Sequence, residues 1–329
     1  MNEHAAVAVQ AELQPLLEFT GRVGSDPLLT QASTGNSSLK LDGVLWIKAS
    51  GRWMADALRD DIFIPLNLTE VEDCRRRGID PTERYPRASL ETAMHAALPH
   101  RVVLHVHCVN TIAWAVRSDA LIHLESRLHS LPWQWIPYVA SGLPLSRAIE
   151  RALSARPDAC VFILGNHGLV VAADDIQTVE ALLREVQERL SVAPREAHPP
   201  DYAELLEICS HSSGWDLPDD DALHFLGTDP LSRSILTRGL LYPCQAMFST
   251  CRCGNRPFRI IEDRGVLVST SISANNLAML SGLVQVLQRL SPSAPLRYLT
   301  ESEAAAISTP VMDRYRQLAS ASRPASLRR

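Results

Sequence analysis

The sequence predicts an α/β fold, because short apolar strands and amphipathic helices alternate along the chain. Residues 161–190 give the clearest example, with an apolar strand, a turn, a second strand and a helix whose apolar side chains recur every three or four positions. Residues 259–290 repeat the same order of elements. A short strand within 101–110 that runs into a helix over 109–117 supports the same fold class.

The chain length suits one large or two moderate domains, and one segment of distinct composition favours two. A chain of 329 residues is too long for one small domain. The segment 193–200 is rich in proline and charge, which is typical of a linker. We therefore expect a first domain over 1–194, a smaller C-terminal α/β subdomain over 195–305, and a polar, partly disordered tail over 306–329.

The first domain is expected to begin with a helix and a β-hairpin. Residues 6–21 have apolar side chains at helical spacing. Strands over 38–41 and 44–48 flank an Asp-Gly dipeptide, which is typical of a tight hairpin turn. The two ends of the hairpin meet at Gly35, Asn36, Ser50 and Gly51. Backbone N–H groups in such loops can bind an anion, although turn chemistry alone also explains this composition.

A polar segment and a short helix are expected next. Residues 69–88 carry a run of charges and two prolines, so we expect a surface excursion there. Ser89 is a typical helix N-cap, and apolar residues follow at helical spacing until Pro99 ends the helix. Glu91 would then lie at position N2, where the helix dipole favours a carboxylate. His95 lies on the same face of this helix, and we expect it to pack in the core rather than to orient Glu91.

Two histidines on one strand indicate a metal site. Side chains alternate along a strand, so His105 and His107 project from the same face with Cα atoms roughly 6–7 Å apart. His167 precedes a glycine at the end of another apolar strand, and Glu91 lies upstream. Three imidazoles with a carboxylate suit Zn²⁺ first, and also Mn²⁺ or Co²⁺. For the His-x-His pair alone, two hydrogen-bonded core histidines are the alternative.

The remaining elements follow from the same patterns. Residues 119–136 are rich in aromatic side chains, and we expect them to be irregular. Further strands and helices are expected over 62–66, 146–155, 160–167, 168–173 and 179–190.

The C-terminal subdomain repeats the elements of 161–190 without the histidine. Arg264 stands where the first copy has His167. A guanidinium remains protonated at neutral pH and cannot bind a metal, so we expect this subdomain to serve packing or assembly. Cys251 and Cys253 lack the CxxC spacing of a structural zinc site, which disfavours a second metal there.

The composition disfavours several classes of partner. A net charge of −5 gives no electrostatic reason to expect nucleic acid or an anionic membrane. No apolar run reaches the roughly 18 residues of a membrane helix, and the first residues lack the basic segment of a signal peptide. Seven scattered cysteines favour reduced thiols over a disulfide scaffold, so we expect a cytoplasmic protein.

Six motifs in order resemble those of the class II aldolase/adducin family, which includes metal-dependent sugar-phosphate aldolases and pentulose-phosphate 4-epimerases. They span roughly residues 8–192 and read TGNSS (34–38), KASG (48–51), SLETAMH (89–95), HVH (105–107), PYVASG (137–142) and NHG (166–168). The resemblance implies a three-layer α/β/α domain around a mostly antiparallel sheet. It also implies a homo-oligomer, usually a tetramer, with its sites at subunit interfaces.

The resemblance further implies roles for individual residues. The metal ligands would be His105, His107 and His167, and Glu91 would act as a ligand in the resting site and as the catalytic acid or base. The substrate's phosphate or equivalent oxygens would be held by Gly35, Asn36, Ser50, Gly51 and Ser89.

The function that the resemblance implies is that of a metal-dependent lyase. Such an enzyme cleaves or forms a C–C bond of a hydroxyketone or sugar phosphate through a metal-stabilised enediolate. An epimerase, dehydratase or decarboxylase could use the same metal site. A non-catalytic interaction protein of the adducin type is a third alternative, which the presence of all three histidines disfavours.

Overall fold

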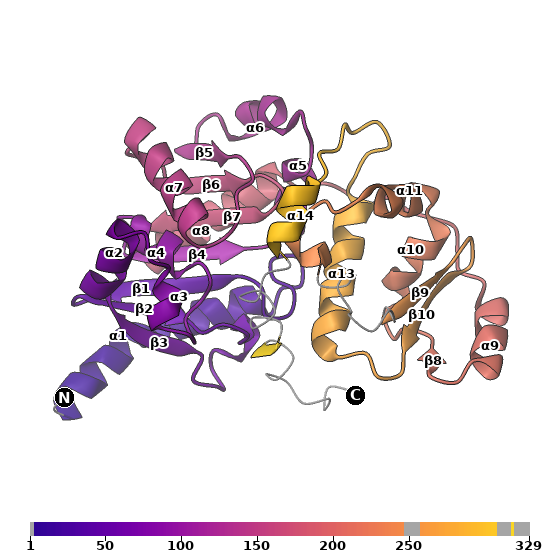
Figure 1. Ribbon diagram of the computed structural model, residues 1–329, viewed down its shortest axis with the longest axis horizontal. Coiled ribbons are helices and arrows are strands. Elements are labelled where there is room, and N and C mark those ends of the chain that lie inside the picture. Colours follow the sequence, from indigo (N-terminus) through magenta and orange to yellow (C-terminus); the bar gives the residue numbers. More distant parts are fainter. Residues whose placement is uncertain (1–2, 247–256, 308–316, 319–329) are drawn as a thin grey trace.

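A computed structural model describes residues 3–246, 257–307 and 317–318, with side chains from residue 11 onward. Cys251, Cys253 and most of the expected tail over 306–329 lie outside these described residues. These described residues form two sheets, and helix α13 (Ala274–Gln288) lies between them (Figure 1). No helix of the described part combines the length and the apolarity that crossing a membrane requires.

A seven-stranded sheet organises the first part of the chain. Its strands, in chain order, are β1 (Asn36–Leu41), β2 (Val44–Lys48), β3 (Phe63–Asn67), β4 (Val102–Val106), β5 (Trp133–Ile136), β6 (Val161–Leu164) and β7 (Gly168–Ala173). The spatial order is β3-β2-β1-β4-β7-β6-β5. Every neighbouring pair is antiparallel except β5 and β6, so the predicted, mostly antiparallel sheet is confirmed.

The helices of this part connect the strands. They are α1 (Glu3–Gly24), the 3₁₀ turn η1 (Met54–Asp56), α2 (Leu68–Arg76), α3 (Pro81–Arg84), α4 (Thr92–Ala97), α5 (Val109–Ala115), α6 (Ala120–Leu128), α7 (Leu143–Ala155) and α8 (Ile176–Arg189). Helices α1, α6 and α8 pack on the face of the sheet that carries Leu104, whereas α4 and α7 pack on the face that carries Val103. The two buried faces follow from the alternation of apolar side chains along β4, and they confirm the three-layer α/β/α architecture.

The hairpin that leads into the site forms as its turn chemistry predicts. Asp42 and Gly43 have φ angles of 49° and 76°, the left-handed conformation that a two-residue hairpin turn requires. Strand β1 also pairs with β4, with Asn36 opposite His105. The start of the hairpin therefore lies directly beside the strand that carries the histidines.

Two local expectations were wrong. Residues 119–136 form α6 and β5 instead of an irregular stretch, because Ala120, Leu124 and Leu128 recur every four residues and are buried. The polar segment 69–88 was expected to be a surface excursion, and most of its residues are at least partly exposed; it contains α2 and α3, which are capped by side chains of the preceding residues. The helix expected after Ser89 begins at Thr92.

The C-terminal part builds a small second sheet. It contains β8 (Trp215–Asp216), β9 (Phe258–Ile261) and β10 (Gly265–Ser269) in the order β8-β10-β9, with helices α9 (Tyr202–His211), η2 (Asp221–His224), α10 (Phe225–Thr228), α11 (Pro230–Arg238), η3 (Pro243–Gln245), α13 and α14 (Glu301–Ile307). The order β9, turn, β10 and α13 parallels the order β6, turn, β7 and α8, and Asn166 and Asp263 in the two turns both have positive φ angles, 52° and 57°.

The core of the C-terminal part includes residues of the first part. Apolar side chains of α13 share one cluster with Val109, Ile112 and Ala113 of α5. Helix α5 begins two residues after His107. Packing between the two parts therefore reaches the strand end that carries the predicted metal ligands.

Candidate metal centre

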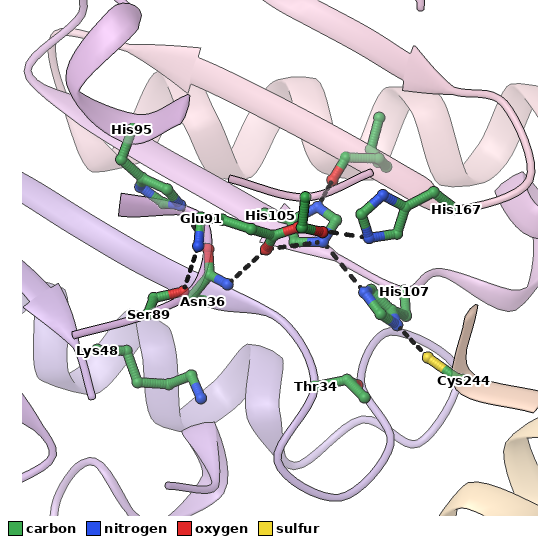
Figure 2. Close-up of polar contacts among 12 residues, drawn as sticks. Thr34, Asn36, Lys48, Ser89, Glu91, His95, His105, His107, His167 and Cys244 are labelled. Atoms are coloured by element: carbon green, nitrogen blue, oxygen red, sulfur yellow. Dashed lines mark hydrogen bonds and ion pairs between the residues drawn. The ribbon is translucent and has the colours of Figure 1, made fainter. Parts of the chain in front are cut away.

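The three predicted histidines converge in the buried interior (Figure 2). His105 lies within β4, His107 follows the end of β4, and His167 lies in the turn between β6 and β7. Pairing of β4 with β7 brings that turn beside the end of β4. One ring nitrogen of each histidine lies within 4.8 Å of the others, and the three residues are 0–8% exposed.

Glu91 points at the same centre. Its Oε2 lies 3.3 Å from His105 Nε2, and its Oε1 lies 3.4 Å from His167 Nε2. Asn36 Nδ2 donates a hydrogen bond to Oε2 at 2.8 Å, and Ser141 Oγ donates to Oε1 at 3.2 Å. Both carboxylate oxygens are therefore fixed towards the rings.

The predicted position of Glu91 at N2 of a helix was wrong. Glu91 is the N-cap residue of α4, and its side chain makes no capping hydrogen bond. Ser89 Oγ instead accepts from the backbone N–H of Glu91 at 3.2 Å, in a turn that precedes the helix. The carboxylate is thus free of the helix end and directed into the site.

The hydrogen bonds of the rings indicate their tautomers. His105 Nδ1 lies 3.0 Å from the carbonyl oxygen of Leu169, so Nδ1 carries the proton and Nε2 holds a lone pair. His107 Nε2 lies only 3.1 Å from this Nε2. Two lone pairs at this distance repel one another unless a proton or a cation lies between them. Neutral imidazole nitrogens that converge with a carboxylate are the donor set that Zn²⁺ and similar ions prefer, so the residues fit a divalent metal.

The electrostatics favour neutral rings beside an ionised carboxylate. Burial lowers the pKa of His107 far below its ordinary value. Burial also lowers the pKa of His167, to about 4, against the opposing effect of Glu91. Burial alone would raise the pKa of Glu91, but His105, His167 and the hydrogen bond from Asn36 together hold it below its ordinary value. His107, His167 and Glu91 therefore have the protonation states of metal ligands at neutral pH.

His95 does more than pack in the core, which corrects the expectation. Its Nε2 contacts Asn36 Oδ1, and its Nδ1 lies 2.7 Å from Ser38 Oγ. Asn36 uses its other amide atom to bind Glu91, so a chain of hydrogen bonds runs from Ser38 through His95 and Asn36 to the carboxylate. The spacing of four residues between Glu91 and His95 places both on one helix face, and it was the available signal that His95 could help to orient Glu91.

A pocket of about 80 Å³ opens beside the metal centre. It is lined by Ser33, Thr34, Gly35, Asn36, Lys48, Ser50, Ser89, Leu90, Glu91, His107, Ser141, His167, Pro243, Cys244 and Met279. The structure therefore gathers Gly35, Asn36, Ser50 and Ser89 at one place, as expected. Gly51 and His105 do not line the pocket.

Lys48 brings a cation to the pocket. Its ammonium group is buried and donates to the carbonyl oxygens of Arg52 at 2.6 Å and Ser33 at 3.1 Å. Burial lowers the pKa of Lys48 to about 7, although Glu91 opposes the shift. Its charge is therefore sensitive to whatever anion shares the pocket.

Several contributors to the site were missed by the sequence analysis. Ser141 lies in the PYVASG motif, which was the available signal for it. Cys244 had no signal, yet its Sγ lies 2.9 Å from His107 Nδ1. Cys244, Pro243 and Met279 all belong to the C-terminal part, and together they form one wall of the pocket. The expectation that the C-terminal subdomain serves only packing or assembly was therefore incomplete.

Comparison with curated proteins finds one partial relative. The protein named uncharacterized oxidoreductase YuxG from Bacillus subtilis (strain 168) is 26% identical over 188 residues. The match covers 50% of this chain and 27% of that protein, so this chain spans about a quarter of the relative's length.

Solved structures are also similar, and two of them serve as examples. One is the N-terminal class II aldolase domain of a conserved protein from Thermoplasma acidophilum, with 20% identity, 53% of this chain and 89% of that chain covered, and a TM-score of 0.46. The other is the L-fuculose-1-phosphate aldolase from Thermus thermophilus, with 18% identity, coverage of 61% and 99%, and a TM-score of 0.38.

A family model gives the decisive match. The model described as Class II Aldolase and Adducin N-terminal domain matches residues 20–193, which is more than half of the chain. The matched segment contains β1 to β7 and all three histidines of the centre. The predicted resemblance is confirmed, and the chain belongs to the class II aldolase and adducin family.

Proposed function

We propose that this protein is a metal-dependent lyase of the class II aldolase type, which cleaves or forms a C–C bond of a hydroxyketone or sugar phosphate. The observation that carries the proposal is the convergence of three histidine nitrogens with the Glu91 carboxylate beside a polar pocket. Membership of the family supports enzymatic function of this kind.

In this proposal the histidines bind the metal and Glu91 transfers the proton. His105, His107 and His167 hold the divalent metal, with Zn²⁺ as the first choice and Mn²⁺ or Co²⁺ as alternatives. When bound, the metal supplies a Lewis acid for a carbonyl oxygen of the substrate. Glu91 accepts the substrate proton and returns it, because its oxygens are ionised, buried and aimed at the same point.

The hairpin loops bind the anionic end of the substrate in this proposal. Gly35, Asn36, Ser50 and Ser89 line the pocket, and Gly51 lies next to Ser50 in the chain. Backbone N–H groups and hydroxyls of such loops are suited to phosphate oxygens, and Lys48 adds positive charge. The relay from Ser38 through His95 keeps Asn36 turned towards Glu91.

Metal analysis tests the first half of the proposal. The purified protein should contain, or take up, about one divalent ion per chain, and His105→Ala should lose most of it. His123→Ala is the matched control, since His123 lies on α6 and pairs with Asp119. A wild-type protein that neither contains nor takes up metal would refute the proposal.

A substrate screen tests the second half. Phosphorylated and free ketoses and hydroxy-keto acids should be assayed for retro-aldol cleavage with Zn²⁺, Mn²⁺ or Co²⁺ added. Glu91→Gln should retain metal and lose cleavage, whereas Glu180→Gln, at an exposed carboxylate on α8, should behave as the wild type. Turnover by epimerisation, dehydration or decarboxylation without aldol cleavage would reassign the reaction.

The assembly and the division of the chain are part of the proposal. We expect a homo-oligomer, with a tetramer favoured, and a boundary between catalytic domain and C-terminal subdomain near residue 194. Light scattering on the purified chain measures the oligomer size, and a monomer that is fully active would contradict this expectation.

A further inference from the structure

The three histidines differ in how the backbone holds them. His105 lies inside β4, paired with Asn36 of β1 on one side and Val170 of β7 on the other. Its ring is fixed by the carbonyl oxygen of Leu169. His107 and His167 lie beyond the ends of their strands, where the sheet does not hold them. Glu91 contacts the ring of His167, and other contacts from outside the sheet must help to fix these two rings.

The C-terminal part contacts His107 directly. Cys244 Sγ lies 2.9 Å from His107 Nδ1, on the side of the ring away from Nε2 (Figure 2). Cys244 thus cannot share a metal ion with that Nε2, but it can fix the ring and hold the proton on Nδ1. Cys244 lies in η3, and Gln245 of the same turn binds back to the N–H of Leu241 at 2.8 Å.

A second, independent contact holds the turn that carries His167. Asn166 Nδ2 donates to the carbonyl oxygens of Leu241 and Arg297, both at 2.8 Å. Arg297 Nη1 donates in return to Asn166 Oδ1 at 2.8 Å. Asn166 has a φ angle of 52°, which most residues adopt only when neighbouring contacts fix it. The side chain of Asn166 therefore ties the turn before His167 to the C-terminal part.

A third contact, at Gln31, lies at the interface between helix α13 and the backbone of His107. Gln31 Nε2 donates to the carbonyl oxygen of His107 at 3.2 Å. Gly282 of α13 packs so closely on Gln31 that a Cβ at this glycine would lie 2.3 Å from Gln31 Cγ. Helix α13 therefore presses on the residue that binds the backbone of His107.

We infer that residues 241–245 and Arg297 are positioning elements for the metal centre: they fix the rings of His107 and His167 so that the three nitrogens converge. The inference rests on the proposed function, because it assumes that these histidines bind metal. It assigns to the C-terminal subdomain, which lies outside the segment matched by the family model, control over metal affinity.

Zinc affinity of the full-length protein, measured by competition with a chromogenic chelator, tests the inference. Cys244→Ala should weaken zinc binding by about 10–100-fold, the usual cost of losing a residue that orients a ligand. Cys244→Ser should retain most of the affinity, because its hydroxyl can still bind His107 Nδ1. Cys209→Ala on α9 is the matched control, and its affinity should equal that of the wild type.

A second variant, Arg297→Met, tests how the ring of His167 is positioned. Arg297→Met removes the hydrogen bond to Asn166 Oδ1 and should weaken zinc binding by about tenfold. Arg264→Ala, which removes an exposed arginine paired with Glu204, should leave the affinity unchanged. The absorption spectrum of the Co²⁺ form gives a further readout, since a displaced ligand changes its bands. If circular dichroism shows that Cys244→Ala does not fold, the zinc affinity of Arg297→Met alone tests the inference.

The outcomes separate the inference from the proposed function. A wild-type protein that takes up no metal overturns both. A wild-type protein that binds zinc, with folded Cys244→Ala and Arg297→Met variants that bind it as tightly and give the same Co²⁺ spectrum, overturns the inference and leaves the function standing. Weaker binding in both folded variants, with unchanged controls, supports it.

Discussion

Replacing His95 by glutamine tests whether this buried ring is held neutral beside Glu91. Burial is the largest cause that lowers the pKa of His95, to about 3 from an ordinary value of 6.5. In the unfolded chain the ring binds a proton below about pH 6.5, whereas the folded protein does not, so folding loses stability as the pH falls. At about 1.4 kcal/mol per pH unit, the loss between pH 6.5 and pH 4.5 is about 3 kcal/mol. Above pH 6.5 both states are neutral and the effect vanishes.

Glutamine at this position keeps the hydrogen bonds and removes the titration. Its amide can donate to Asn36 Oδ1 and accept from Ser38 Oγ. Urea unfolding of the metal-free wild type and of His95→Gln should be compared at pH 7.5 and pH 4.5. The other histidines titrate in both proteins, so the difference between the two isolates His95. Acidification should shift the relative stability in favour of the variant by about 3 kcal/mol.

His95→Leu provides the contrast at neutral pH. It leaves Ser38 Oγ and Asn36 Oδ1 buried without these partners, at a cost of about 1–3 kcal/mol each. Equal losses of unfolding free energy by the wild type and His95→Gln on acidification would show that the folded protein does not keep the ring neutral. The relay to Glu91 would then need a different account.

Other variants test the core, the interface and the pocket. Leu104→Ala, on the face of β4 opposite His105, should lower the unfolding free energy by about 2–5 kcal/mol in urea, while Leu121→Ala, at an exposed position of α6, should change it by less than about 0.5 kcal/mol. Similar losses in both would contradict the packing. Removing all residues after 196 should cause aggregation measurable by light scattering, because α5 loses the α13 side chains that cover it; a soluble fragment of unchanged oligomer size would argue against this. Lys48→Met should weaken binding of inorganic phosphate in calorimetric titration, and unchanged affinity would remove Lys48 from the anion site.

The parts of the structure that the sequence predicted depend on local patterns. The hairpin follows from an Asp-Gly pair between two apolar strands, and both turn residues adopt the left-handed conformation. The common face of His105 and His107 follows from the period of two in a strand. The approach of His167 does not follow from either pattern, because it depends on the pairing of β4 with β7; its place before a glycine at a strand end only suggested it as a ligand, and the resemblance to a family supported that role.

The local errors have a common cause. Aromatic and charged residues hid the apolar spacing of α6 and the caps of α2 and α3. At Ser89, a favourable N-cap residue was read as the helix start, although its hydroxyl caps a turn and the helix begins three residues later. Propensity indicates which side chains can cap a backbone N–H, but neighbouring packing decides which turn they cap.

The contact between His107 and Cys244 was beyond any local pattern, because 137 residues separate the two. This contact shows that residues outside the segment matched by the family model also form the site. The hairpin loops that supply the polar side of the pocket lie inside the segment 20–193, whereas Pro243, Cys244 and Met279 lie outside it. A change at Pro243 or Met279 would alter the wall of the pocket without replacing a side chain that contacts the three imidazoles or Glu91, whereas a change at Cys244 would also affect the ring of His107. If the proposed function holds, the choice of substrate should therefore depend on Pro243 and Met279 of the C-terminal subdomain as well as on the hairpin loops.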